Sequence, residues 1–263
     1  MISSSHNPKI QWVRDLQTQA HARQEAQAFV VEGVRLAEEA LAAGWQAQLV
    51  LYSEETGPRG MAVIEKFIRQ RAPVEQVTPQ VLKAAADTET PQGLLAVLSM
   101  RALPMPEMPN FLLILDEMRD PGNLGTILRT AAAAGVQSVL IPPGSADHYA
   151  PKVVRAAMGA HFHLPVLRLD WEELLQSLIP HVEHGMCIYL ADSSGGVAYT
   201  RADFRRSLTL IVGGEARGAG NQAQALAQQK VQIPMPGGTE SLNAAVAAGI
   251  LLFEVLRQRD IRP

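Results

Sequence analysis

Four uninterrupted apolar runs constrain the fold of the second half of this chain more than any other feature. They are FLLIL at residues 111–115, SVLIP at 138–142, CIYLA at 187–191 and LTLIV at 208–212. A continuous apolar run is typical of a strand that is covered on both faces. Helical patterns separate these runs, which predicts a parallel sheet with helices on both sides. We expect those helices at residues 124–134, 152–158, 171–178, 222–228 and 242–259.

The first hundred residues show a shorter alternation of the same kind. Strands are expected at residues 29–31, 48–52, 74–77 and 94–98, and helices at 36–43, 61–69 and 81–86. Residues 101–110, RALPMPEMPN, hold three prolines and no periodic pattern, which is typical of a linker. The sequence therefore predicts a small α/β domain at 1–100, a linker at 101–110 and a larger α/β domain at 111–263.

Composition excludes several classes of protein. The single cysteine, Cys187, rules out a disulfide framework or a cysteine-based zinc site within one chain. The start, MISSSHNPK, lacks the apolar core of a secretory signal, and the apolar run from Ala244 to Phe253 is too short to span a bilayer. We therefore expect a cytoplasmic protein without a membrane partner. The net charge of -3 gives no general attraction to nucleic acid, so any such binding depends on local clusters.

Three polar segments marked by glycine each follow a predicted strand. They are DPGNLGTILRTA at residues 120–131, GGEARG at 213–218 and IPMPGGTESLN at 233–243. The carboxyl ends of parallel strands meet at one edge of a sheet, and ligands usually bind there. The sequence therefore predicts a single site to which all three segments contribute.

Each segment also has a simpler structural interpretation. The first is a capped helix with a solvated Arg129, the second a flexible loop, and the third a capped core helix. We expect Asn123 to cap the first helix and Ser241 to cap the last one, where its hydroxyl can accept a free backbone N–H. Two glycines at 213–214 would let a ligand approach the backbone closely, with Glu215 at the rim.

Common catalytic and cofactor motifs are absent. The sequence has no G-x-G-x-x-G after a strand, no G-x-x-x-x-G-K-[ST] and no G-x-S-x-G. His161 and His163 are expected to alternate along a short strand rather than bind metal, because no third ligand has a suitable spacing. No metal site is predicted.

The three segments together, in this order, resemble the SpoU (TrmH-like) family of the SPOUT superfamily. Its members are S-adenosylmethionine-dependent RNA 2′-O-ribose methyltransferases. The motifs that carry the resemblance are N-L-G-T-I-L-R-T-A, G-G-E-A-R-G and I-P-M-x-x-x-x-x-S-L-N, and it covers residues 111 to 259. The first part is similar to the family's N-terminal RNA-binding domain, itself like small ribosomal RNA-binding proteins. The matching motifs there are looser: S-x-N-P-K at 5–9, F-V-V-E-G-x-R at 29–35 and T-P-Q-G at 90–93.

The resemblance implies a trefoil knot near the C-terminus, a homodimer formed by the second part, and S-adenosylmethionine as cofactor. The residues that would surround the cofactor are Leu190, Gly213, Ile233, Met235 and Leu242. Those that match the family's functional polar positions are Asn123, Arg129, Glu215, Ser241 and Asn243. Those expected to contact RNA are Asn7, Lys9, Arg23 and Arg35.

The sequence departs from the family pattern in two places. The second motif often reads G-N-E, and here Gly214 replaces the asparagine, which removes an amide near the site. The segment from His21 to Arg23 is less basic than in relatives. Both departures concern groups that would touch RNA or the reacting ribose.

Arg129 is the family's candidate beside the ribose hydroxyl. Because a free guanidinium has a pKa above about 12, it is a poor base, and we expect a clamp on phosphate and developing alkoxide charge. Glu215 is expected to orient Arg129, and Ser241 or Asn243 to fix the ribose.

The predicted function is methyl transfer to a ribose 2′-hydroxyl in RNA. The two-domain layout favours ribosomal RNA over tRNA, and DNA is not expected. Two alternatives remain: a catalytically silent RNA-binding relative, and a methyltransferase that acts on a protein or a base. Retention of Arg129, Glu215 and Asn243 argues against the first, and the N-terminal resemblance argues against the second.

Overall fold

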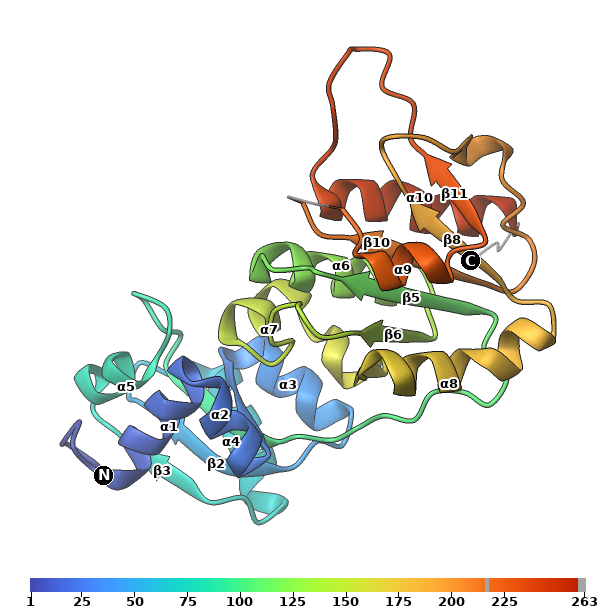
Figure 1. The fold of residues 1–263 in the computed structure, drawn as a ribbon. Coiled ribbons are helices and arrows are strands. Elements are labelled where there is room, and N and C mark those ends of the chain that lie inside the picture. The colour runs from blue at the N-terminus through green and yellow to red at the C-terminus, as the bar shows by residue number, and fades with distance from the viewer. Residues whose placement is uncertain (216–217, 260–263) are drawn as a thin grey trace. The chain divides into compact units, whose positions relative to one another are not determined.

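The computed structural model describes residues 1–215 and 218–259. The chain forms two compact units (Figure 1). The first contains Met1–Arg101 together with Tyr149–Phe162, and the second contains Ala102–His148 and the chain from His163 onward. A helical segment from the second half of the sequence therefore packs with the first unit, which a single cut at residues 101–110 does not anticipate.

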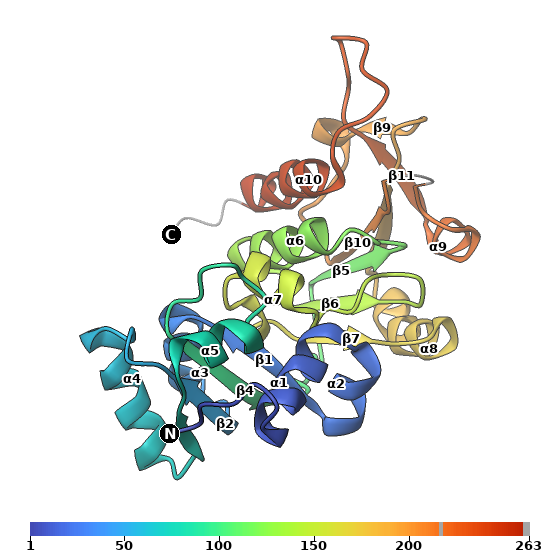
Figure 2. The same cartoon turned by 90° about the vertical axis from the view of Figure 1, so that its left-hand side faces the viewer.

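The first unit is a four-stranded mixed sheet with the order β1-β4-β2-β3. Apolar side chains of α1 and α5 pack on one face of this sheet, and those of α3, α4 and α7 on the other (Figure 2). Its strands are β1 (Ala28–Glu32), β2 (Ala47–Tyr52), β3 (Val74–Gln76) and β4 (Leu94–Ser99). Its helices are α1 (Pro8–Thr18), α2 (Ala20–Ala26), α3 (Val34–Ala42), α4 (Pro58–Arg69), α5 (Pro79–Ala85) and α7 (Pro151–Ala157), followed by the 3₁₀ turn Ala160–Phe162.

Helices α1 and α2 were not expected from the sequence. Asn7 caps α1, since its side-chain oxygen accepts the backbone N–H of Lys9 at 2.9 Å, and Pro8 follows at the first helical position. The helix buries Ile10, Val13 and Leu16 in the core of the unit. The motif S-x-N-P-K therefore has a structural role, because it forms the start of α1.

The other predicted RNA contacts differ in exposure. Lys9 and Arg35 are exposed and form ion pairs with Glu75 and Glu39. Arg23, in contrast, is only 4% exposed, and its Nη1 donates to the carbonyl of Leu16 at 2.7 Å. Burial therefore removes Arg23 from the surface where RNA was expected to meet it, because its guanidinium satisfies carbonyls at the end of α1.

We predict that Arg23→Ala lowers the free energy of unfolding by about 2–4 kcal/mol, because it leaves buried carbonyls without a donor. Arg14→Ala, which removes an exposed arginine of α1, should change it by less than about 0.5 kcal/mol. Urea unfolding of both variants measures the difference. Equal stability of the two would show that the buried guanidinium has no structural role.

The second unit is a seven-stranded sheet with the order β7-β6-β5-β10-β8-β11-β9. All its strand pairs are parallel, which confirms the predicted sheet type. The four strands predicted from apolar runs are β5 (Phe111–Asp116), β6 (Ser138–Ile141), β8 (Cys187–Ala191) and β10 (Leu208–Gly213). Three shorter strands were not expected: β7 (Val166–Arg168), β9 (Val197–Ala198) and β11 (Gln229–Gln232).

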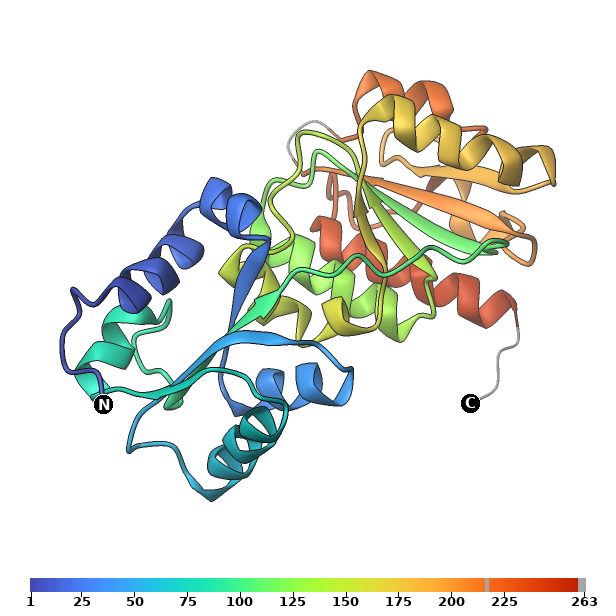
Figure 3. The ribbon, with the colours of Figure 1, turned by 90° about the horizontal axis from the view of Figure 1, so that it is seen from below.

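Helices cover both faces of this sheet, as predicted. Helices α8 (Trp171–Glu183) and α9 (Asn221–Leu226) lie on one face, and α6 (Pro121–Ala133) and α10 (Ala244–Gln258) on the other (Figure 3). Between β11 and α10 the chain projects as a long loop (Figure 2). Across the described part of the chain, no helix combines the length and apolar character needed to cross a membrane.

His161 and His163 do not lie on a strand, so that expectation was wrong. His161 is buried in the 3₁₀ turn Ala160–Phe162, and His163 is exposed ahead of β7. Gly159 precedes the turn with φ +91, a conformation that favours glycine and lets the chain reverse there. Among residues 1–215 and 218–259, no three His, Cys, Asp or Glu side chains are grouped so as to hold a metal ion.

Candidate active site

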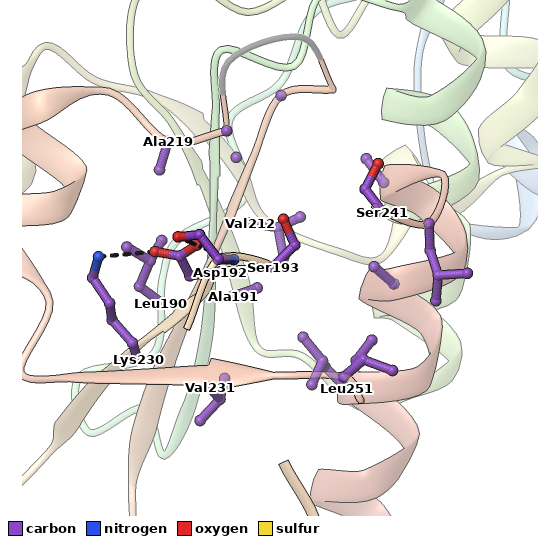
Figure 4. Close-up of a pocket in the computed structure, with 18 of the residues that line it drawn as sticks. Leu190, Ala191, Asp192, Ser193, Val212, Ala219, Lys230, Val231, Ser241 and Leu251 are labelled. Carbon is purple, nitrogen blue, oxygen red and sulfur yellow. Dashed lines mark hydrogen bonds and ion pairs between the residues drawn. The ribbon is translucent and has the colours of Figure 1, made fainter. Parts of the chain in front are cut away.

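The main cavity of the second unit lies where β8, β10 and β11 end. Its volume is about 300 Å³, at the lower end of the range for small-molecule sites, about 300–1,000 Å³. Leu190, Val212 and Leu251 provide apolar walls, and Gly213 and Gly214 expose backbone to it (Figure 4). The residues predicted to surround the cofactor all line this cavity: Leu190, Gly213, Ile233, Met235 and Leu242.

One end of the main cavity is charged. Lys230 Nζ donates to Asp192 Oδ2 at 2.8 Å, a contact that Figure 4 draws as a dashed line. Asp192 Oδ1 accepts the backbone N–H and the hydroxyl of Ser194 at 2.8 and 2.6 Å. Partial burial works to raise the pKa of Asp192, but the bonds from Lys230 and Ser194 outweigh it and lower the pKa. Asp192 is therefore a fixed carboxylate at neutral pH.

The three polar segments meet at the side chain of Asn243. Its Nδ2 donates to Asn123 Oδ1 at 3.1 Å and approaches Glu215 Oε1 at 3.4 Å. Its Oδ1 accepts the backbone N–H groups of Ala245 and Val246 at 2.9 and 3.2 Å. Asn243 is thus the N-cap of α10, and the expectation that Ser241 caps it was wrong. Ser241 is exposed and lines the main cavity instead.

Asn123 is not the cap of its helix either. Asp120 caps α6, because its Oδ1 accepts the backbone N–H of Asn123 at 2.8 Å. The Asn123 amide is therefore available for the bond to Asn243. The true caps lie three residues before Asn123 and two residues after Ser241, which leaves Asn123 to accept from Asn243 and Ser241 to line the main cavity.

Arg129 lies on the exposed side of α6. It lines neither the main cavity nor the smaller one beside it, and it makes no hydrogen bond or ion pair with any described residue. Glu215 bonds to Asn243, so within the described residues it does not orient Arg129 as expected. Arg129 is free to meet a partner from outside the chain.

The glycines at the end of β10 are required by the chain itself. A Cβ at Gly213 would lie 2.2 Å from the backbone nitrogen of Ala219, and one at Gly214 would lie 2.1 Å from the carbonyl oxygen of Glu117. The segment folds back so that the Gly218 N–H donates to the Gly214 carbonyl at 3.0 Å. These contacts, rather than the approach of a ligand alone, explain why no side chain is tolerated here.

Asp116 is a site residue that sequence reasoning missed. It ends β5, is only 2% exposed, and its Oδ2 accepts the Gly220 N–H at 2.7 Å, which ties the returning loop to the sheet. Burial raises its pKa, and the charge of Glu117 adds to this, against the lowering effect of the Gly220 N–H. The signal in the sequence was a lone carboxylate directly after an apolar strand.

We predict that Asp116→Ala lowers the free energy of unfolding by about 1–3 kcal/mol, because the partly buried Gly220 N–H loses its acceptor. Asp116→Asn keeps an acceptor oxygen and should stay within about 1 kcal/mol of wild type. Since the pKa of Asp116 is raised in the folded state, wild type should lose stability relative to Asp116→Asn as pH rises from the ordinary Asp pKa through the folded value. Urea unfolding across the acid range tests both statements, and a pH-independent difference would contradict the second.

Comparisons with known proteins agree with this geometry. Residues 110–253 match the SpoU rRNA Methylase family, and residues 7–96 match an MRM3-like substrate binding domain. The chain belongs to the SpoU family. This confirms the resemblance carried by the three motifs, including the N-terminal substrate-binding domain that precedes them.

The chain is 34% identical to the 23S rRNA (guanosine(2553)-2'-O)-methyltransferase RlmP of Bacillus subtilis, over 97% of this chain and 98% of RlmP. It is 35% identical to the mitochondrial rRNA methyltransferase 3A of Danio rerio over 87% of this chain, but spans only 63% of that relative. Among solved structures it is similar to the SpoU methyltransferase AviRb of Streptomyces viridochromogenes in complex with AdoMet, with TM-score 0.88, 30% identity and coverage of 97% of this chain and 99% of AviRb. An AdoMet-bound rRNA methyltransferase from Sinorhizobium meliloti gives TM-score 0.87 at 30% identity, covering 97% of each chain.

Proposed function

We propose that this SpoU-family protein transfers a methyl group from S-adenosylmethionine to the ribose 2′-hydroxyl of one nucleotide in ribosomal RNA. The observation that carries the proposal is the meeting of Asn123, Glu215 and Asn243 beside the main cavity. Relatives that cover the chain end to end are named as 23S rRNA 2'-O-methyltransferases, and two structural neighbours hold AdoMet. The proposed setting is the cytoplasm, and tRNA is the alternative substrate.

The residues of the main cavity fit the cofactor. Leu190, Ile233 and Leu242 offer apolar contact for a flat base, while backbone at Gly213 and Met235 offers hydrogen bonds. Because Lys230 pairs with Asp192, the Glu215 carboxylate leaves the cavity lining with a net negative charge, which favours a cation. When bound, S-adenosylmethionine supplies a methyl group already activated on a positively charged sulfur.

The chain's own residues then have to position the ribose. The Asn243 side chain cannot rotate freely, because its oxygen accepts two backbone N–H groups of α10. Its amide fixes Asn123 and Glu215, and the Ser241 hydroxyl lines the same cavity. Alignment of this kind contributes up to roughly 7–11 kcal/mol in ideal intramolecular reactions, so these polar groups serve to orient the 2′-hydroxyl.

RNA would be gathered by the first unit. Lys9 and Arg35 are exposed there, and their ion pairs are of a kind that contributes little stability, so phosphates can replace the carboxylates. Asn7 caps α1 and lies two residues from Lys9. Arg23 is no longer included in this surface because it is buried.

The test of the proposed function is to map 2′-O-methyl sites on RNA from cells with and without the gene. The expected result is loss of a single site in large-subunit ribosomal RNA, restored by the wild-type gene. Loss of a tRNA site would select the alternative substrate, and an unchanged map would reject methyl transfer to ribose. Purified protein should bind S-adenosylmethionine and its demethylated product, whereas nicotinamide dinucleotide should not bind.

Arg129 is expected to act on turnover far more than on folding. If its free guanidinium clamps phosphate and developing alkoxide charge, Arg129→Ala should slow single-turnover methylation by about 10²–10³. Arg129→Lys should recover little, because an ammonium lacks the bidentate fork. Melting temperature and S-adenosylmethionine affinity should stay close to wild type, since Arg129 has no described partner within the chain. Wild-type rates in Arg129→Ala would remove it from the site.

We also propose a homodimer formed by α10, and the deep trefoil knot stays a prediction from the family resemblance. Val246 and Phe253, seven residues apart and so two turns along one face of α10, are 52% and 50% exposed. Exposed apolar side chains on one face are typical of an interaction surface.

Wild type should therefore give about twice the 28.5 kDa mass of one chain in light scattering at micromolar concentration. Phe253→Asp should shift the mass toward the monomer, because an unpaired charge at an interface costs several kcal/mol, roughly 2–5. Ile179→Asp on α8, which removes an equally exposed apolar side chain, is the control and should leave the mass unchanged. A monomeric wild type would contradict the proposal.

A further inference from the structure

A second, smaller cavity adjoins the main one. It holds about 110 Å³ between the β5–α6 loop, residues 117–120, and the end of β10. Both cavities share Gly214, Glu215 and Gly218. A group bound in the second cavity would therefore lie against Glu215, on the side of the loop rather than of the cofactor.

The loop that forms this cavity is held firmly at both ends. Met118 is fully buried, its N–H donates to Ser145 Oγ at 2.9 Å, and its carbonyl accepts the Ala146 N–H at 2.9 Å. Asp120 caps α6 directly afterwards. Arg119 stands between these two residues, so its backbone is fixed while its side chain is 67% exposed.

The backbone of this loop also blocks the position that the Cβ of a side chain at residue 214 would occupy. Glu117 adopts φ +54, a sparsely populated conformation for a residue other than glycine. Its carbonyl oxygen lies 2.1 Å from the position of a Cβ at Gly214. Where many SpoU sequences carry an asparagine amide, this chain has the backbone of Glu117, followed by the guanidinium of Arg119.

The guanidinium has one partner among the described residues. Arg119 Nη2 donates to Glu117 Oε2 at 2.5 Å, in a pair whose arginine is exposed and whose glutamate is partly exposed. Exposed pairs of this kind are weak, so a phosphate can replace the carboxylate at little cost. The planar fork of an arginine matches two phosphate oxygens at once.

We propose that Arg119 is a substrate-positioning residue that binds an RNA phosphate next to the target ribose. Glu117 keeps the guanidinium in place until RNA arrives. The inference rests on the proposed function, because it assigns the second cavity to the RNA side of that site. Arg119 thus supplies a polar contact from the β5–α6 loop at a place where Gly214 has no side chain to offer one.

The test compares Arg119→Ala with Arg205→Ala in the full-length protein. Arg205 is also exposed, also pairs with a carboxylate two residues earlier, Asp203 at 2.7 Å, and lines neither cavity. The substrate is an unmodified 23S rRNA transcript, and both methylation kinetics and binding are measured over a range of salt. The two variants remove the same charge, so only the position differs.

Arg119→Ala should raise KM for the transcript about tenfold, with kcat at saturation within about twofold of wild type. The slope of log affinity against log salt should fall by roughly 0.7–1, as expected for one lost phosphate contact. Arg119→Lys should recover part of the affinity, and Glu117→Gln should lower KM by releasing the guanidinium. Arg205→Ala should leave KM and slope unchanged.

Equal KM and equal salt slopes in Arg119→Ala and Arg205→Ala would overturn the proposal. A fall in melting temperature that accounts for the loss would assign Arg119 to the structure of the loop and would overturn it as well. If wild type transfers no methyl group to the transcript, the proposed function fails. Binding of the same transcript by the two variants then still decides whether Arg119 contacts RNA phosphate.

Discussion

The side chain of Asn243 is the interaction on which the site depends. Its oxygen accepts two N–H groups at the start of α10, and its nitrogen reaches Asn123 and Glu215 from the other two segments. One amide therefore sets the start of a long helix and the relative positions of three loops. The amide has an oxygen that accepts the helix N–H groups and a nitrogen that donates to both neighbours, whereas an aspartate could cap the helix but could not donate to the two acceptors.

A second constraint on the site is the bond between Asp116 and the loop that follows β10. Asp116 accepts the Gly220 N–H. The end of β10 lies so close to the backbone of Ala219 and Glu117 that neither Gly213 nor Gly214 could carry a side chain. A buried carboxylate with a raised pKa costs stability, and the bond from the Gly220 N–H offsets part of that cost. In return, Asp116 holds in place the loop whose backbone forms one wall of each cavity.

Much of this architecture followed from the sequence, and the failures have physical reasons. Continuous apolar runs predicted β5, β6, β8 and β10, because strands covered on both faces have no polar residues to alternate with. Strands β7, β9 and β11 were missed because they are two to four residues long and lie at or near the edges of the sheet, where side chains are partly exposed. The packing of Tyr149–Phe162 with the first unit depends on contacts between residues far apart in the sequence, such as Phe29 with Tyr149, which no local pattern reports.

The structure brings Asn123, Glu215 and Asn243 together, but the residues that cap the two helices differ from those expected. Ser241 and Asn123 have good capping side chains, yet Asn243 and Asp120 cap the two helices. Serine, asparagine and aspartate rank similarly at an N-cap, so propensity alone could not choose among these four residues. Asp116 was missed because its neighbours predicted a buried strand, in which a carboxylate is uncommon.

Arg23 and Arg129 show that residue type alone does not separate structure from function. Both are arginines in or next to recognised motifs, but one is buried against carbonyls of α1 and the other is exposed without a described partner. A guanidinium that has satisfied its donors inside the fold has little left to offer a phosphate, whereas an exposed one keeps all five N–H groups. A net charge of -3 gives the chain no general attraction to phosphates, so contact with phosphate depends on individual arginines and lysines whose donors are not used inside the fold. The geometry of individual arginines, more than their number, therefore decides where this protein can hold its substrate.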